Sequence, residues 1–214
     1  MTAFAPIHHW PEAVAFVVEQ HGDDFRKGTR VPYLTHVMAV AETLAYYYPE
    51  RDALIVAGLL HDVVEDTEAT FERLEAHFGR EVAALVRAVS KDDEAMVAAD
   101  GRAVPPMPRS PQDERALWRR RREFMLAHVR GPGVPADVLR LKAADALANL
   151  TAIHRDLANP VVGEGVWERF KVGRDESLWF YGAVVASVEA GIGGEPLAAA
   201  LRRALAAVSG QASA

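Results

Sequence analysis

The sequence predicts an all-α fold built as one domain. Apolar residues recur at helical spacing along most of the chain, whereas runs of alternating β-branched residues are scarce. Hydrophobic residues make up 50% of the 214 residues, which is enough to bury a sizeable core. No internal repeat or second core pattern is evident. We therefore expect one domain over residues 1–195, followed by an Ala-rich helix and a flexible tail over residues 196–214.

The first third of the chain contains three expected helices, over residues 11–20, 32–48 and 51–66. The first has a wide apolar face and stops before Gly22. The second carries apolar residues at helical spacing and ends before Pro49, because the residue that precedes a proline avoids the α conformation. The third is apolar on almost every side through Leu60, which predicts a buried central helix with a polar end at residues 61–66.

Capping and breaking residues divide the middle of the chain. Thr70 can cap a short helix that ends at Gly79, since glycine readily adopts the left-handed conformation that follows a helix. Valine and leucine then recur at helical spacing over residues 82–89. The segment 92–109 collects charges and prolines without a sustained period, so we expect a mobile loop there.

The last part of the chain returns to helical patterns. Ser110 followed by Pro111 predicts a capped helix start, and that helix should end before the break at 131–133. It carries four consecutive arginines, Arg119 to Arg122, which form either a solvated face or a phosphate-binding site. Further helices are expected over residues 136–157, 166–189 and from 196 onward.

Composition excludes several functional classes. The net charge of -6 argues against a general nucleic-acid binder, because such proteins usually carry a basic surface. Cysteine is absent, which excludes a disulfide framework and a cysteine nucleophile. No signal peptide is recognisable, and no segment approaches the ~18 apolar residues that a membrane span needs. We expect a cytoplasmic protein without a membrane or nucleic-acid partner, and leave open whether it forms a homo-oligomer.

The polar end of the third helix is the most informative feature for function. His61, Asp62, Glu65 and Asp66 follow an apolar run within a few positions of one another. On a helix, positions four apart share a face, so His61 would stack over Glu65, and Asp62 over Asp66. Four ligands or proton carriers at the end of a buried helix indicate chemistry rather than packing.

An imidazole and a carboxylate together suit a divalent ion such as Mn, Fe, Co or Zn. His61 and Asp62 alone are too few for a stable site, so neighbouring helices should supply the remaining ligands. His36 and Asp145 are the candidates, because each is a polar residue on an otherwise apolar helical face.

Four motifs together resemble a known family. They are Pro32-Tyr33-x-x-His36, His61-Asp62-x-x-Glu65-Asp66-Thr67, His77-Phe78-Gly79-x-x-Val82-Ala83-x-Leu85-Val86 and Lys142-x-x-Asp145-x-x-x-Asn149. The first, second and fourth contain the H…HD…D pattern of the HD metal-dependent phosphohydrolases. The full set is similar to the hydrolase domain of RelA/SpoT-type proteins and their small stand-alone relatives. This resemblance implies an HD-type helical bundle and a guanosine-3′,5′-bis(diphosphate) 3′-pyrophosphohydrolase, active on (p)ppGpp with one Mn²⁺ ion.

The resemblance also implies roles for individual residues. The metal ligands would be His36, His61, Asp62 and Asp145. The catalytic acids, which position or deprotonate the attacking water, would be Glu65 and Asp66. The contacts to the nucleotide substrate would come from Arg26, Lys27 and Asn149. Relatives usually carry Arg and His where this chain has Ala146 and Ala148, so we expect these differences to act on nucleotide choice.

Two other functions remain open from the sequence. The chain could be an HD phosphohydrolase of another nucleotide, such as a nucleoside monophosphate or a phosphorylated dinucleotide. It could also be a catalytically silent HD module that senses a metal or a nucleotide. The acidic pair Glu65 and Asp66 favours an enzyme, because a pure binding module has no need of a base beside the ion.

Overall fold

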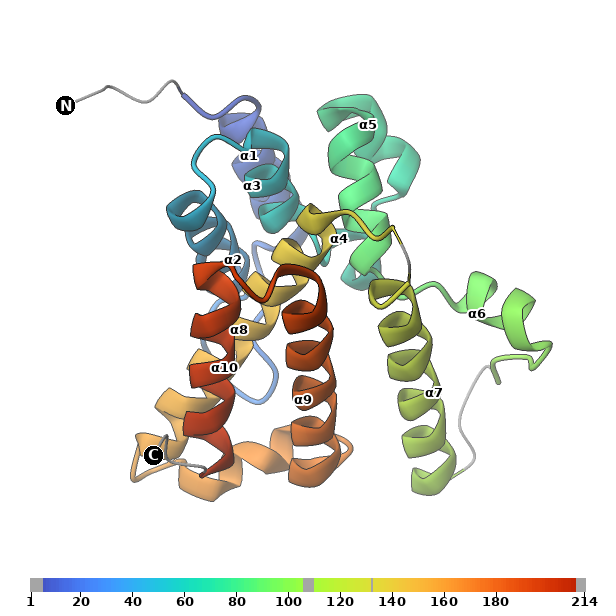
Figure 1. Cartoon of the computed structure of the whole chain (residues 1–214), viewed down its shortest axis with the longest axis vertical. Helices are drawn as coiled ribbons and strands as arrows, with labels where there is room; N and C mark the ends of the chain where they lie inside the picture. Colours follow the sequence, from blue (N-terminus) through green and yellow to red (C-terminus); the bar gives the residue numbers. More distant parts are fainter. Residues whose placement is uncertain (1–5, 106–109, 132, 211–214) are drawn as a thin grey trace.

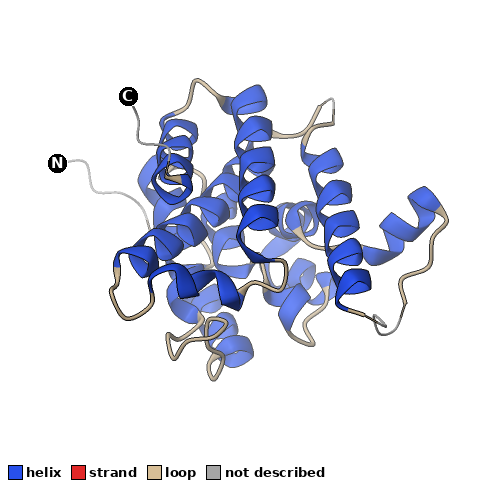
Figure 2. Cartoon of the chain, turned by 90° about the horizontal axis from the view of Figure 1, so that it is seen from below, coloured by secondary structure: helices blue, strands red, loops and turns tan. Residues whose placement is uncertain are grey.

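Helices form almost all of the regular structure, which confirms the predicted all-α class (Figures 1 and 2). The computed structural model describes residues 6–105, 110–131 and 133–210. Within these ranges the only pairing of strand type is an isolated bridge between Phe25 and Pro32. The helices are α1 (Trp10–His21), α2 (Leu34–Tyr47), α3 (Asp52–Leu60), α4 (Val63–Asp66), α5 (Phe71–Val89), α6 (Asp93–Asp100), α7 (Pro111–Val129), α8 (Ala136–Ala158), the 3₁₀ helix η1 (Gly163–Arg169), α9 (Gly173–Ile192) and α10 (Pro196–Ser209).

Two buried helices organise the bundle. Every residue of α3 from Leu54 to Leu60 is buried, and α3 packs against α1, α2, α5 and α8, as expected for a central helix. Helix α8 contacts α2, α9 and α10 as well (Figure 1). Because apolar burial fixes both helices on several sides, the polar residues that they carry are held in a rigid frame.

The continuous helix predicted over residues 51–66 is wrong in one respect. Helix α3 ends at Leu60, and Asp62 takes φ −102° and ψ −6° before the short helix α4 begins. The backbone N–H groups of Glu65 and Asp66 then bond to the carbonyl of Asp62, which starts a new turn. As a consequence His61 and Asp62 are not splayed around one helix, and their side chains converge.

Helix α5 bends where the sequence predicts an end and a new beginning. The Thr70 hydroxyl accepts a hydrogen bond from the Arg73 N–H and caps the first part. Gly79 interrupts the helix with φ 85° and ψ 165°, a backbone region that is essentially restricted to glycine. The predicted break at Gly79 is confirmed.

The segment predicted as a mobile loop contains a helix instead. Residues 93–100 form α6, because the Asp92 carboxylate caps the first turn and Met96 is buried. Asp93 and Asp100 pair with Arg121 and Arg120 of α7, and Figures 1 and 2 show α6 beside α7 at the edge of the molecule. Residues 106–109, also part of the predicted loop, lie outside the described residues.

The C-terminal region differs from the prediction at one boundary. The helix expected over residues 166–189 is split into η1 and α9, and Gly173, the first residue of α9, takes φ 75°. The expected final helix is present as α10, which buries Leu197 and Leu201 against α8 and α9. The end of the predicted tail, residues 211–214, lies outside the described residues. None of the described helices has the length and apolar character needed to span a membrane.

Candidate metal centre and substrate pocket

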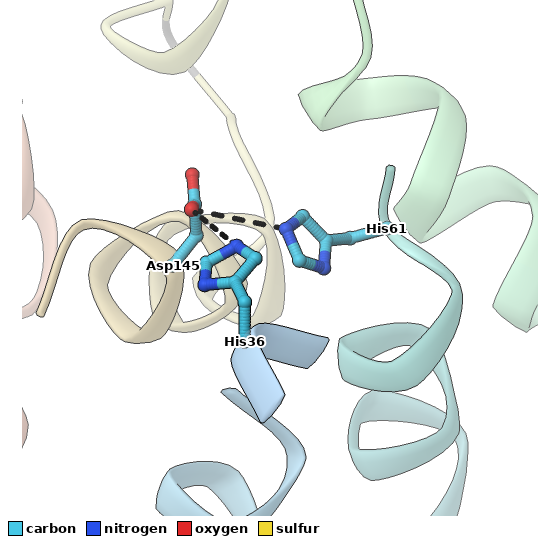
Figure 3. A group of neighbouring side chains, drawn as sticks. All are labelled: His36, His61 and Asp145. Atoms are coloured by element: carbon cyan, nitrogen blue, oxygen red, sulfur yellow. Dashed lines mark ion pairs between the residues drawn. The ribbon is translucent and has the colours of Figure 1, made fainter. Parts of the chain in front are cut away.

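The four predicted metal ligands converge at the centre of the bundle. His36 comes from α2, Asp145 from α8, and His61 and Asp62 from the break after α3. The His61 Nε2 atom lies 3.0 Å from Asp62 Oδ2 and 3.8 Å from Asp145 Oδ1. The His36 Nε2 atom lies 3.6 Å and 3.5 Å from the same two carboxylate oxygens. Figure 3 shows both imidazoles pointing toward the Asp145 carboxylate.

The hydrogen bonding of His61 makes this cluster suitable for a cation. Its Nδ1 lies 2.9 Å from the carbonyl oxygen of Gly58, so Nδ1 carries the hydrogen and donates it. Its Nε2 is then left as an acceptor toward two carboxylates, and it is buried without a hydrogen-bond partner. A lone pair facing carboxylates in a buried site is repulsive unless a positive charge lies between them. His36, His61 and Asp145 therefore form a group that could hold a divalent metal ion, and Asp62 lies beside it.

The pKa shifts of His61, Asp62 and Asp145 also indicate that the cluster favours a positive charge at its centre. Burial lowers the pKa of His61, but the Asp62 and Asp145 carboxylates outweigh it and raise the pKa well above the ordinary value. Burial also opposes ionisation of the two aspartates. Nevertheless His61 lowers the pKa of Asp62 well below its usual range, and Lys142, followed by the two histidines, does the same for Asp145. A proton on His61 thus occupies the position that a metal ion would take.

Three neighbouring side chains hold the carboxylates in place. The Tyr33 hydroxyl donates a hydrogen bond to Asp62 Oδ2. Asn149 Nδ2 donates to Asp145 Oδ1 at 2.6 Å, and Lys142 Nζ donates to Asp145 Oδ2 at 2.8 Å. Sequence reasoning assigned no role to Tyr33 or Lys142, although each stands inside a motif that contains a ligand. For Asn149 it predicted only a substrate contact.

The two predicted catalytic acids lie next to the cluster but in different surroundings. Glu65 accepts a hydrogen bond from the backbone N–H of Lys91 at 2.7 Å and forms an ion pair with the Lys91 ammonium. Asp66 has no such partner among the described residues, and burial together with the Asp62 charge raises its pKa above the ordinary value. A raised pKa makes the Asp66 carboxylate a better proton acceptor than an ordinary aspartate.

One cavity of about 370 Å³ contains all nine residues that the sequence singled out for the metal, for catalysis and for the substrate. Arg26 enters from the loop before α2 and donates a hydrogen bond to Asn149 Oδ1 at 2.8 Å. Sequence reasoning missed several further cations in the lining, namely Lys91, Lys142, Arg155 and Arg169. It left Arg122 undecided, and this residue also lines the cavity.

The two alanines that depart from the pattern of relatives lie elsewhere. Neither Ala146 nor Ala148 lines the cavity. Ala146 is buried and Ala148 packs against the hydrophobic core. The alanines at these two positions therefore contribute nothing to the described lining of the cavity, and their effect on nucleotide choice stays a prediction.

Comparison with known proteins agrees with this geometry. A family model described as the HD domain matches residues 13–164, a range that contains His36, His61, Asp62 and Asp145. The chain belongs to the HD-domain family. Helices α9 and α10 lie beyond the range that the HD-domain model matches.

Two similar proteins carry the same name, guanosine-3′,5′-bis(diphosphate) 3′-pyrophosphohydrolase MESH1. The protein from Mus musculus is 32% identical over 146 residues, which are 67% of this chain and 69% of the relative. The protein from Xenopus tropicalis is 42% identical over 83 residues, which are 38% of this chain and 46% of the relative. The match to the Xenopus protein thus spans about half of that relative's length.

A solved structure extends the similarity to the whole chain. It is described as a metazoan ortholog of SpoT that hydrolyzes ppGpp and plays a role in starvation responses. It superposes with a TM-score of 0.70 and 25% sequence identity, over 98% of this chain and 99% of the other. The similarity of fold therefore includes α9 and α10, which lie beyond the range of the HD-domain model.

Proposed function

We propose that this HD-domain chain is a metal-dependent hydrolase that removes the 3′-pyrophosphate from guanosine-3′,5′-bis(diphosphate). The observation that carries the proposal is the shared cavity, in which a two-histidine, two-aspartate cluster lies beside an acidic pair and several cations. The relatives named for this reaction and the solved structure of a ppGpp-hydrolysing protein support the choice of substrate.

His36, His61, Asp62 and Asp145 would hold the metal ion, which we propose to be Mn²⁺. A divalent ion at this position lowers the pKa of a water molecule and polarises a phosphoryl oxygen. Tyr33, Asn149 and Lys142 keep the two aspartates oriented through the hydrogen bonds described above. The ligands are thereby positioned before the ion arrives.

Asp66 and Glu65 have different roles toward the attacking water. Asp66, whose pKa is raised by burial and by Asp62, takes the proton of the water as it attacks the phosphorus attached to the 3′ oxygen. Glu65, fixed by Lys91, orients the water through a hydrogen bond. The new bond joins the water oxygen to phosphorus while the bond to the 3′ oxygen breaks. The 3′ oxygen takes up a proton, and pyrophosphate and a guanosine 5′-diphosphate leave.

Cations compensate the charge of the phosphates. Arg26, Lys27 and Arg155 line the cavity, and among the described residues none of them is paired with a carboxylate. Guanidinium groups bind phosphate oxygens through paired hydrogen bonds, and these bonds strengthen as negative charge develops. A small anionic nucleotide therefore suits this cavity although the chain as a whole is acidic.

The proposal is tested by incubating the protein, loaded with Mn²⁺, with ppGpp and a panel of other nucleotides. We expect pyrophosphate and guanosine 5′-diphosphate from ppGpp. Release of phosphate from a nucleoside monophosphate or a phosphorylated dinucleotide, with ppGpp left intact, would favour an HD phosphohydrolase of another nucleotide. Tight metal and nucleotide binding without any product would favour the sensing module.

A further inference from the structure

A second, smaller cavity of about 210 Å³ adjoins the substrate pocket. Both cavities are lined by the same four residues, which are Lys27, Arg122, Phe170 and Tyr181. The remaining wall of the smaller cavity comes from α7, α9 and the turn between η1 and α9, and it adds Trp118, Lys171, Val172, Ser177 and Phe180. We call this space the aromatic chamber.

The charged side chains that line the aromatic chamber are all positive. Among the described residues its lining contains Lys27, Arg122 and Lys171 and no acidic residue, although the chain carries a net charge of -6. Lys171 pairs with Glu114, which is not part of the lining. Four aromatic rings, together with Val172 and Ser177, form the rest of the wall, and the rings keep the local dielectric low. A negative group is the ligand that such a space stabilises.

Arg122 differs from the three arginines that precede it. Arg119 pairs with Glu123 and Glu176, Arg120 with Asp100, and Arg121 with Asp93. Among the described residues no carboxylate pairs with Arg122. Its guanidinium instead lies 4.6 Å from the ring centroid of Phe180 and 5.7 Å from that of Trp118. The rings hold the planar group in place and leave its N–H donors free for a ligand.

The aromatic chamber lies close to the metal cluster. Lys142 Nζ is 2.8 Å from Asp145 Oδ2, and the same Nζ is 5.9 Å from the ring centroid of Phe180. One lysine side chain thus separates a wall of the chamber from a metal ligand. A single nucleotide can therefore reach both sites, with one phosphate group at the metal cluster and another in the chamber.

We propose that the aromatic chamber binds the second phosphate-bearing group of the substrate, and that Arg122 selects nucleotides that carry phosphates at two positions. This inference rests on the proposed function, because it assigns the first phosphate-bearing group to the metal cluster. It adds a specificity-determining residue on α7 to the contacts already described.

The test compares two nucleotides that differ in the second group only. One is guanosine-3′,5′-bis(diphosphate), and the other is guanosine 3′-diphosphate, which has no 5′ phosphates. In the Arg122→Met variant we expect KM for the doubly phosphorylated nucleotide to rise about tenfold or more, the loss expected for a hydrogen bond to a charged group. We expect KM for guanosine 3′-diphosphate to rise much less, because this nucleotide places no group in the chamber, and the ratio of the two KM values is the readout.

Matched variants separate a ligand contact from a structural role. Arg120→Met removes the same charge from the same helix but breaks only the contacts of Arg120 with α6 and the segment after it, so both KM values should stay at the wild-type level. Arg122→Lys keeps the charge and should recover part of the loss. Equal increases of both KM values in Arg122→Met, or no increase in either, would overturn the proposal.

A binding measurement without turnover keeps this inference separate from the proposed hydrolysis. Calorimetry in the presence of EDTA should show that the wild type binds the doubly phosphorylated nucleotide more tightly than guanosine 3′-diphosphate, and that Arg122→Met abolishes the difference. That result would support the chamber even if no nucleotide were hydrolysed. Equal affinity of the wild type for both nucleotides would refute the chamber and leave the hydrolysis proposal standing.

Discussion

Replacing Tyr33 by phenylalanine tests how the metal centre is held. The Tyr33 hydroxyl donates to Asp62 Oδ2, the same carboxylate oxygen that faces the imidazoles of His36 and His61. Burial and the Asp62 charge raise the pKa of Tyr33, so its hydroxyl stays protonated and donates at every physiological pH. The Tyr33→Phe variant removes this donor and keeps the ring, which packs against His21 and His36.

The size of the effect follows from the kind of hydrogen bond that is lost. A hydrogen bond to a charged group contributes about 1.5–3 kcal/mol, and each ~1.4 kcal/mol is a factor of ten in an equilibrium constant. Loss of an outer partner of a metal ligand typically costs about 10–100-fold in metal affinity. We therefore expect Kd for Mn²⁺ to rise about 10–100-fold in Tyr33→Phe.

Calorimetric titration of the metal-free variant with Mn²⁺ at constant pH measures this change directly. Tyr46→Phe is the matched control, because Tyr46 is 78% exposed and removing its hydroxyl should leave Kd unchanged. Thermal unfolding in EDTA shows whether Tyr33→Phe is folded. A folded Tyr33→Phe variant whose Kd stays within about twofold of wild type would refute the role of Tyr33 in orienting Asp62.

Three further predictions concern the acids, the pH and the metal. Glu65→Gln and Asp66→Asn should each lower kcat about 100-fold or more while metal content, measured by mass spectrometry, stays normal; unchanged turnover would remove both from the mechanism. Because the pKa of His61 is raised on folding, the protonated imidazole stabilises the metal-free protein below a pH of about 6.5. That contribution is lost as the pH rises from about 6.5 through the raised pKa of His61. Tm measured in EDTA should therefore fall over this pH range, whereas Tm measured with Mn²⁺ should not. If Tm changed with pH in the same way under both conditions, the metal ion would not replace the His61 proton. Mn²⁺ at about 100 times its Kd should raise the free energy of unfolding of the wild type by about 2.7 kcal/mol, and Asp145→Ala should show no such increase in thermal unfolding. An equal increase in the wild type and in Asp145→Ala would mean that the ion binds elsewhere.

Helix formation was accessible from the sequence because it depends on local patterns, and the motifs singled out His36, His61, Asp62 and Asp145, which the structure brings together. Their role as metal ligands stays a prediction. The apolar run before His61 predicted the buried helix α3, and Thr70 and Gly79 predicted the start and the bend of α5. The break at His61 and Asp62 was not accessible, because the residues on both sides are compatible with helix. At this break Tyr33 contacts Asp62 and Asp145 lies near His61, and such contacts arise only after folding.

The aromatic chamber shows a second limit of sequence reasoning. Arg119 to Arg122 are chemically identical in the sequence, and which of them is paired depends on acids that α6 and α9 bring near α7. Helix α6 itself was missed, since charges and prolines around it masked the capping role of Asp92. The partners that decide the role of Arg122 are thus set by long-range packing.

Product analysis in water labelled with heavy oxygen tests the central claim most directly. The protein, loaded with Mn²⁺, is mixed with ppGpp, and the masses of pyrophosphate and guanosine 5′-diphosphate are measured by mass spectrometry. If water attacks phosphorus at the His36, His61, Asp62 and Asp145 cluster, the label enters pyrophosphate and is absent from guanosine 5′-diphosphate, and Asp62→Asn forms neither product. Label in the nucleoside diphosphate, or undiminished product from Asp62→Asn, would contradict the account.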